Sequence, residues 1–447
     1  MRKAQKKQME DFIKLLDQAH DEIKKAIEIN KIDLALDLLE QCQEGAIKLG
    51  ELIESIEGQN VETIPILENY CELTYQIHEE VKLSQLTVAK KAYKNLRKLL
   101  IKIEASIKND ITVHKEVVFL PYKASMWDSF ESVWKAAVED SSCDVYVIPI
   151  PYYDKNPNGS FRELHYEGEQ FPSYVPITHY NSYEFEERHP DIIFIHNPYD
   201  EYNFVTSVHP FFFSRNLKRY TDQLIYIPYF VLEEIDPNDV EKVKSMKHFC
   251  TVPGVLNSDK TVVQSEDMRQ IYINVLTEYT GENTSKVWEE KIVGLGSPKI
   301  DKVLSTRRED IKIPEDWRKI LQKPDGSFKK TILYNISVGA LLQHDEKMLE
   351  KIQNVFQLFK ENQSDVALLW RAHPLIKATI ESMKPQLWKG YEKLVQEYRS
   401  DGWGIYDDSP DLDRAIIISD GYYGDRSSLV HLYKQINKPI LIQEIDI

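Results

Sequence analysis

Basic residues are in the minority in this 447-residue chain, and the deficit argues against one class of function. Lys and Arg number 56 against 72 Asp and Glu, which gives a formal net charge of −16. A protein that binds nucleic acid without sequence preference needs a basic face, so we expect no nucleic-acid partner. The balance still allows a local basic pocket that binds phosphate.

Cysteine is scarce as well, and its spacing excludes two kinds of site. The four cysteines are Cys42, Cys71, Cys143 and Cys250, with no C-x-x-C pair. Zinc and thioredoxin-type sites need close pairs, so we expect buried free thiols in a reducing compartment. No paired-aspartate motif indicates a cation site, and we interpret the acidic run 407–413 as turn and cap residues. We therefore predict neither a metal nor a cofactor.

Long apolar runs are also absent from the sequence. No stretch approaches the roughly 18 apolar residues that indicate a membrane-spanning helix. The charged N-terminus is not followed by the apolar segment of a signal peptide. We expect a cytoplasmic protein with, at most, peripheral contact at the inner face of a membrane.

Residues 1–110 have the 3.6-residue periodicity of amphipathic helices. Turn signals near residues 30 and 58–60 divide them, which predicts antiparallel helical hairpins or a short coiled coil. We see no catalytic chemistry in this region, and we expect its lone His20 at the surface. The role that we assign to these helices is docking or formation of a homo-oligomer.

The periodicity changes near residue 110 to alternating strands and helices. Apolar, β-branched runs predict strands at 116–122, 144–153, 191–195 and 224–231, with loops between 154 and 183. Such alternation is typical of doubly wound α/β domains. We predict a Rossmann-like domain at 111–247, a second at 248–447, and the helical region at 1–110 before them.

Two strand ends in the second domain carry polar motifs. The run 415–418 reads as a buried strand, followed by a loop with two glycines and by Ser427-Ser428 at the start of a helix. The first amides of a helix lack intrahelical partners, so this order builds an anion site. The alternative is that the serine serves as an N-cap and binds no ligand. A strand at 366–370 runs into Arg371-Ala372-His373-Pro374, which is either a salt-bridged corner or a second wall of one phosphate cleft.

These motifs resemble the CDP-glycerol glycerophosphotransferases of teichoic acid synthesis. Two further stretches agree in order, the glycine-proline loop at 294–303 and the strand at 331–337, so the resemblance covers roughly residues 250–440. It implies the GT-B architecture of two Rossmann-like domains, a donor such as CDP-glycerol or a similar CDP-polyol, and a glycan or polymer hydroxyl as acceptor.

The same resemblance implies roles for individual residues. Donor phosphates are expected to bind the residues Arg371, His373, Ser427 and Ser428, with Lys299 approaching from the glycine-proline loop. Asp420 and Asp425 are expected to orient the ribose or to order the loop.

The sequence departs from this family at one point. Members usually carry Trp-His-Gly after the fourth strand of the first domain, whereas this chain has Ile227-Pro228-Tyr229-Phe230. His196, which directly follows the third strand, or His209 is our candidate for the missing general base. His196 is equally well interpreted as a structural corner with Asn197 and Pro198, and His209 as a packed corner. A sugar-nucleotide glycosyltransferase or epimerase, or a noncatalytic nucleotide-binding protein, stays an alternative.

Overall fold

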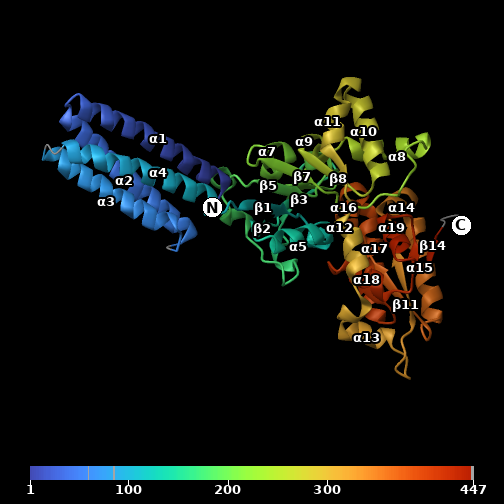
Figure 1. Ribbon diagram of the computed structural model, residues 1–447. Helices are drawn as coiled ribbons and strands as arrows, with labels where there is room; N and C mark the ends of the chain where they lie inside the picture. The colour runs from blue at the N-terminus through green and yellow to red at the C-terminus, as the bar shows by residue number, and fades with distance from the viewer. Residues whose placement is uncertain (59, 84–85, 444–447) are drawn as a thin grey trace. The chain divides into compact units, whose positions relative to one another are not determined.

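The computed structural model describes residues 1–58, 60–83 and 86–443, and it has the α/β class expected from the sequence (Figure 1). Two compact units form: a helical unit of Met1–Glu116 with Ser141–Asp144, and an α/β unit of Val117–Asp140 with Val145–Ile447. Among the described residues, no helix combines the length and the apolar character needed to cross a membrane.

The helical unit is a four-helix arrangement. Its helices are α1 (Lys3–Glu28), α2 (Ile32–Glu57), α3 (Thr63–Lys82) and α4 (Leu86–Asn109). Each helix packs on its neighbour in sequence, and α1 also packs on α4, which closes the bundle. The buried positions of α2 recur every three or four residues, at Ala35, Leu39, Cys42, Ala46, Leu49 and Ile53. The expected helical character of this region is therefore confirmed, and its stability comes from one apolar stripe per helix.

His20 corrects one expectation, because it is completely buried in this bundle rather than exposed. Its Nε2 lies 2.7 Å from the hydroxyl of Tyr70, and Tyr93 donates a hydrogen bond to its carbonyl oxygen. Burial lowers the pKa of the His20 imidazole to about 4. The prediction that His20 is exposed was wrong because it rested on the charged residues next to it in sequence, and neighbouring residues of a helix point to different faces.

The α/β unit begins with a six-stranded sheet in the order β2-β1-β5-β7-β8-β9. Its strands are β1 (Lys115–Leu120), β2 (Cys143–Val147), β5 (Ile192–Ile195), β7 (Gln223–Tyr226), β8 (Lys260–Val263) and β9 (Ile292–Gly294). Its helices are α5 (Glu131–Glu139), α6 (Phe185–Arg188), α7 (Ser214–Leu217), α8 (Val240–Cys250), α9 (Pro253–Asn257), α10 (Glu266–Thr280) and α11 (Ser285–Lys291). Parallel pairing of β7 with β8 and of β8 with β9 carries this sheet past residue 248, where the sequence suggested that the second domain starts.

A small antiparallel sheet forms partly within the predicted loops of 154–183, which contain one of its three strands and the end of another. It has the order β4-β3-β6 and consists of β3 (Tyr152–Lys155), β4 (Phe161–His165) and β6 (Thr206–Val208). Its short, polar, aromatic strands lack the apolar alternation that marks a half-buried strand. We call the six-stranded sheet, its helices and this small sheet the first lobe.

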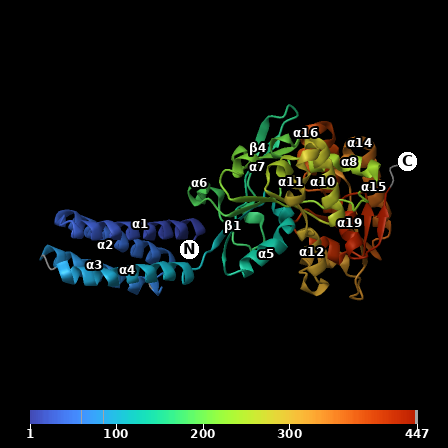
Figure 2. The same cartoon turned by 45° about the horizontal axis from the view of Figure 1, so that its top comes forward.

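The second lobe is built on a five-stranded sheet in the order β12-β11-β10-β13-β14, with every pair parallel. The strands are β10 (Lys330–Asn335), β11 (Val366–Arg371), β12 (Ile405–Asp407), β13 (Gly421–Gly424) and β14 (Ile440–Ile442). The helices are α12 (Pro298–Ser305), α13 (Glu315–Leu321), α14 (Val338–His344), α15 (Glu346–Glu361), α16 (Ile376–Met383), α17 (Trp388–Asp401), α18 (Leu412–Ile418) and α19 (Ser428–Gln435). In Figure 2 the strand β4 of the first lobe lies beside α16, where Arg162 and Glu381 form an ion pair of 2.7 Å.

Both faces of this second sheet are buried, which explains its continuous apolar strands. Leu333 and Leu369 belong to one core cluster, and their neighbours Tyr334 and Trp370 belong to the cluster on the opposite face. Successive strand residues point to opposite faces, so a sheet covered on both sides needs apolar residues throughout. Two parallel sheets covered by helices give the GT-B-like architecture that the sequence predicted.

The run 415–418 corrects the predicted strand that precedes the serine pair. It forms the end of α18, and the strand β13 comes afterwards, from Gly421 to Gly424. Ala415, Ile416 and Ile418 are all buried, so the C-terminal half of this short helix lies in the core. An apolar run of this length has the same pattern in a buried helix and in a buried strand.

Candidate functional site

The C-terminal edge of the second sheet borders a cavity of about 100 Å³. We name it the Arg371 cavity; the second lobe and the first lobe line it with the residues Ser125, Met126, Tyr229, Phe230, Lys299, Asn335, Arg371, Ala372, His373, Pro374, Leu412, Ser427, Ser428 and Leu429. The order in which the strands are added to this sheet reverses between β10 and β13: β11 and β12 lie on one side of β10, and β13 and β14 lie on the other. Ligands of open α/β sheets bind at the carboxyl ends of the strands beside such a reversal.

Five residues that the sequence predicted to bind donor phosphates line this cavity together. Lys299 belongs to α12, Arg371 ends β11 with His373 two residues later, and Ser427 with Ser428 starts α19. Convergence follows from the parallel topology, because the carboxyl ends of parallel strands meet at one edge. Their role as phosphate ligands stays a prediction.

Arg371 is held in place by buried acceptors. It is only 4% exposed, and its Nη1 donates to the carboxylate of Asp407, which is 1% exposed. Its Nη2 donates to the carbonyl oxygen of Ser409 at 2.9 Å. A guanidinium has five N–H donors, so these contacts fix its plane and leave donors for the cavity. Asp407 is therefore more than a turn residue, which corrects the interpretation of the acidic run.

His373 presents a neutral donor to the cavity. Its Nδ1 accepts a hydrogen bond from the Leu375 amide at 3.1 Å, so the proton of the neutral ring is on Nε2. The ring stays accessible from the cavity, but the surrounding protein walls desolvate it, and Lys123 and Arg371 add positive charge. Together these effects lower the pKa of His373 to about 4.

The serine pair lies at the N-terminus of α19, as the sequence predicted. Ser427 is the N-cap, and its Oγ accepts a hydrogen bond from the Leu429 amide at 3.3 Å. The N-cap interpretation therefore holds. The Val430 amide also bonds within the turn, to the Ser427 carbonyl oxygen at 3.1 Å. The amide of Ser428, at the first helical position, has no intrahelical acceptor, so the anion interpretation remains compatible with the N-cap.

Glycine at position 424 allows the loop before this helix to form. Gly424 has φ of 150°, and a Cβ there would lie 1.9 Å from the carbonyl oxygen of Asn335. Directly after it, the Asp425 carboxylate accepts hydrogen bonds from the Ser337 amide and the Gln443 side chain, both at 2.7 Å. Asp425 thus orders the loop, one of the two roles expected for it.

Asp420 does not lie at this edge. It precedes β13, and its carboxylate accepts a hydrogen bond from the amide of Thr331, the second residue of β10, at 2.8 Å. This contact places it at the N-terminal edge of the sheet, so the predicted ribose contact is wrong. The displacement follows from the strand being Gly421–Gly424 rather than 415–418.

Lys299 reaches the cavity but is already paired. It is 5% exposed, and its ammonium group forms an ion pair with Asp128 of the first lobe. On the same helix, Lys302 pairs with Glu131 at 2.9 Å. An anion that enters the cavity therefore competes with Asp128 for Lys299.

His196 is sealed in the core, which contradicts its predicted role as general base. It is completely buried, its Nε2 accepts from the Tyr122 amide at 2.9 Å, and its Nδ1 lies 2.8 Å from the hydroxyl of Ser129. Burial, and then the charge of Lys299, lower its pKa to about 3. Both ring nitrogens are used, so His196 acts as a structural corner.

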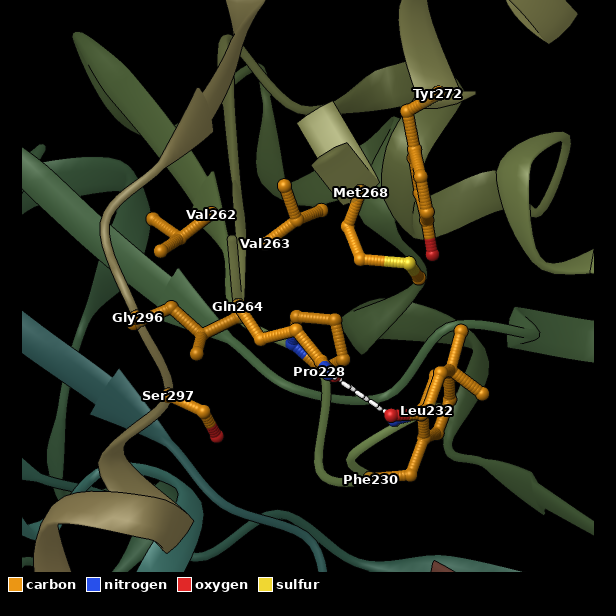
Figure 3. Close-up of a pocket in the computed structure, with 11 residues that line it drawn as sticks. Pro228, Phe230, Leu232, Val262, Val263, Gln264, Met268, Tyr272, Gly296 and Ser297 are labelled. Carbon is orange, nitrogen blue, oxygen red and sulfur yellow. Dashed lines mark hydrogen bonds between the residues drawn. The ribbon is translucent and has the colours of Figure 1, made fainter. Parts of the chain in front are cut away.

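The position of the missing Trp-His-Gly motif offers no replacement base (Figure 3). Pro228 and Phe230 line a pocket of about 20 Å³, whose other residues include Val263, Gln264 and Met268. Gln264 holds this loop through two hydrogen bonds of 2.8 Å with the backbone of Leu232. Tyr272 is the one titratable side chain of the lining, and burial raises its pKa well above the ordinary value.

His209 lies elsewhere in the first lobe. It does not line the Arg371 cavity, nor the larger cavity of about 470 Å³ that shares Arg371 and His373 with it. Burial lowers the pKa of His209. Its Nδ1 accepts a hydrogen bond from the Phe211 amide at 3.3 Å. A base role for His209 stays a prediction, and it requires the acceptor to reach that part of the lobe.

Sequence reasoning missed the contribution of the first lobe to the site. Ser125 lines the Arg371 cavity and also the larger one, about 470 Å³, which Lys123 lines as well. We name the larger one the Trp388 cavity; besides sharing Arg371 and His373, it is lined by aromatic and polar residues that include Trp388, Tyr406, Glu392, Gln396 and Arg399. The signal was available, because Lys123 and Ser125 follow the carboxyl end of β1.

The C-terminal part of the chain is similar to a known protein family. Residues 238–447 match the CDP-Glycerol:Poly(glycerophosphate) glycerophosphotransferase family. The match confirms the resemblance for the part of the chain that carries Lys299, Arg371, His373 and the serine pair. No curated protein matches the chain significantly.

Solved structures of low similarity were also found. A variant of the wall teichoic acid polymerase TagF is 16% identical, covering 83% of this chain and 78% of its own, with a TM-score of 0.40. S. aureus MnaA with UDP is 13% identical over 73% and 78% of the chains, with a TM-score of 0.43. The UDP-GlcNAc 2-epimerase of Neisseria meningitidis is 12% identical over 73% and 82%, with a TM-score of 0.43. Values this low carry no argument about activity.

Proposed function

We propose that the protein transfers glycerol phosphate, or a related polyol phosphate, from a CDP-linked donor to a hydroxyl of a glycan or polymer. The observation that carries the proposal is the convergence of Lys299, Arg371, His373, Ser427 and Ser428 on one cavity. These residues lie inside the part of the chain that matches the glycerophosphotransferases.

The chemistry of the cavity fits a pyrophosphate. The oxygen of the acceptor hydroxyl attacks the phosphorus that carries the polyol, and a new P–O bond forms. The bond from this phosphorus to the bridging oxygen breaks, CMP leaves with that oxygen, and the proton of the hydroxyl passes to the leaving phosphate or to water. Negative charge then grows on CMP, where the guanidinium of Arg371, the Nε2–H of His373 and the Ser428 amide stabilise it. The Trp388 cavity supports the proposal by its size, since about 470 Å³ lies within the usual range of roughly 300–1,000 Å³ for ligand sites.

Three observations favour a second candidate, a nucleotide-binding protein without catalysis. His196 is sealed, the 227–230 stretch has no histidine, and His373 is the one Asp, Glu or His in the lining of the Arg371 cavity. With Nδ1 accepting a backbone hydrogen bond and the proton on Nε2, His373 is a donor rather than a base.

Release of CMP separates the two candidates. The full chain is incubated with CDP-glycerol and a glycan or polymer acceptor, and CMP and product are quantified by mass spectrometry. We expect CMP release that depends on the acceptor and falls at least about tenfold in Arg371→Met. Binding of CDP-glycerol without CMP release would favour the noncatalytic candidate. Release of UDP from UDP-GlcNAc instead would favour a sugar-nucleotide enzyme.

A further inference from the structure

The first lobe contains a second, separate pocket of about 520 Å³. We name it the Tyr153 pocket and define it by Tyr153, Tyr180, Asn181, Glu184, His209 and Phe212. None of its twelve lining residues lines the Arg371 or the Trp388 cavity. A ligand of the Tyr153 pocket would therefore be separate from the donor phosphates.

Aromatic rings form the walls, and they brace one another. Tyr153 stacks on His209 at 6.0 Å between ring centroids, and Tyr180 meets Phe212 edge-on at 6.3 Å. Phe212 in turn contacts Phe211 at 5.0 Å. Rings fixed in this way offer flat apolar surface to a ligand at little cost in conformational entropy.

Polar groups without partners accompany these rings. Within the described residues, the hydroxyls of Tyr153 and Tyr180, the side-chain amide of Asn181 and the carboxylate of Glu184 have no hydrogen-bond partner, whereas the backbone amide of Asn181 donates to the His179 ring. His209 uses Nδ1 to accept from the Phe211 amide, which leaves its Nε2–H as a donor. The pocket thus offers both donors and acceptors.

The charge of the lining selects among ligand classes. Glu184 and Glu186 line the pocket, and none of its twelve residues is Lys or Arg. Arg188 lies over the Tyr183 ring at 4.9 Å but does not line the pocket. A lining with two carboxylates and no Lys or Arg disfavours phosphate and therefore a polyanionic chain. A bare organic cation would contact the carboxylates and the rings. It has no hydrogen-bond acceptor, however, so the Nε2–H of His209 would stay without a partner.

We propose that the Tyr153 pocket binds an uncharged saccharide unit. The C–H faces of a sugar ring lie against aromatic rings, and its hydroxyl groups both donate and accept hydrogen bonds, which matches the mixed set of polar groups. Saccharide binding is independent of the proposed transferase activity, whereas service as its acceptor site rests on that activity. The pocket then selects a neutral glycan acceptor rather than a poly(glycerol phosphate) chain.

The test uses the full chain and defined probes. Maltotriose, cellotriose and chitotriose are titrated by calorimetry and by saturation-transfer NMR, with a poly(glycerol phosphate) oligomer as the anionic probe. We expect at least one neutral trisaccharide to bind. Tyr180→Ala should weaken this binding at least about tenfold, by analogy with loss of a stacking ring at a nucleobase. The exposed Glu184→Ala should weaken it to a similar extent through the lost charged acceptor.

A matched control is Tyr279→Ala, which removes a tyrosine that is 65% exposed on α10 and should change nothing. Three results overturn the inference: no binding of any neutral trisaccharide at millimolar concentration, binding that both pocket variants retain, or tighter binding of the anionic oligomer that Tyr180→Ala abolishes. CMP release without saccharide binding refutes this inference alone. Saccharide binding without CMP release refutes only the transferase.

Discussion

The buried ion pair of Arg371 and Asp407 offers a sharp test of the donor site. Asp407→Asn keeps the shape of the side chain and removes its charge. Arg371 is 4% exposed and Asp407 is 1% exposed, so the substitution leaves an uncompensated guanidinium in the protein interior. Ser409 would retain its contact through a carbonyl oxygen, but the acceptor that fixes Nη1 would lose its charge.

The expected changes in stability and in donor affinity follow from the burial of this ion pair. Removing one partner of a buried pair costs about 3–5 kcal/mol, and we expect a loss near this range in the free energy of unfolding. A hydrogen bond to a charged group contributes about 1.5–3 kcal/mol, so a misplaced guanidinium should weaken CDP-glycerol binding at least about tenfold. Arg371→Met with Asp407→Leu removes both charges and should recover part of the lost stability while donor binding stays weak. Recovery is incomplete because the amide and hydroxyl of Ser409, and the guanidinium of Arg414, also lose Asp407 as their acceptor.

The assay combines urea unfolding with calorimetric titration of CDP-glycerol for each variant. Asp401→Asn is the matched control, because its pair with Lys360 is 45% exposed on both sides and should contribute about 1 kcal/mol or less. A double variant that is as stable as the parent and still binds CDP-glycerol with full affinity would refute the assignment of Arg371 to the donor site.

Three further substitutions test the structure at separate points. Gly424→Ala should destabilise the protein by about 3 kcal/mol or more, because its Cβ would overlap the Asn335 carbonyl; an unchanged melting temperature would contradict this. His196→Ala should lower stability by about 1–3 kcal/mol, since the Tyr122 amide loses its acceptor, and it should reduce kcat less than tenfold. A hundredfold loss of kcat at unchanged stability would instead restore His196 as the base. His20 has its ordinary pKa of 6.5 in the unfolded chain and about 4 in the bundle, so the unfolded state binds the proton first as the pH falls. His20 should therefore contribute a decrease of about 3 kcal/mol in the free energy of unfolding between pH 6.5 and 4, and His20→Phe should reduce the measured pH dependence by this amount in urea titrations.

The position of the site was predictable because it depends on strand ends. Arg371 and His373 follow an apolar run that formed β11 as expected, and Ser427 starts a helix as expected. Parallel strands place their carboxyl ends at one edge, so residues that follow strands far apart in sequence converge. This rule needs only the order of strands and helices, which the hydrophobic pattern contains.

The hydrophobic pattern gave a wrong prediction where a short helix and a strand have the same pattern. The buried run 415–418 fits a short helix or a strand equally well, and the helix formed. That choice moved β13 by a few residues and put Asp420 at the opposite edge from Asp425. A shift of this size decides which carboxylate can approach a ligand.

The sequence by itself therefore determined the α/β class, the helical N-terminal region and the cationic and serine residues of the cavity. Tertiary structure alone decided which of these side chains are free. The partners of His196 lie 74 and 67 residues away, at Tyr122 and Ser129, and those of Arg371 lie 36 and 38 residues away. Burial and hydrogen bonding depend on such distant contacts, and a local pattern of residue types does not contain them.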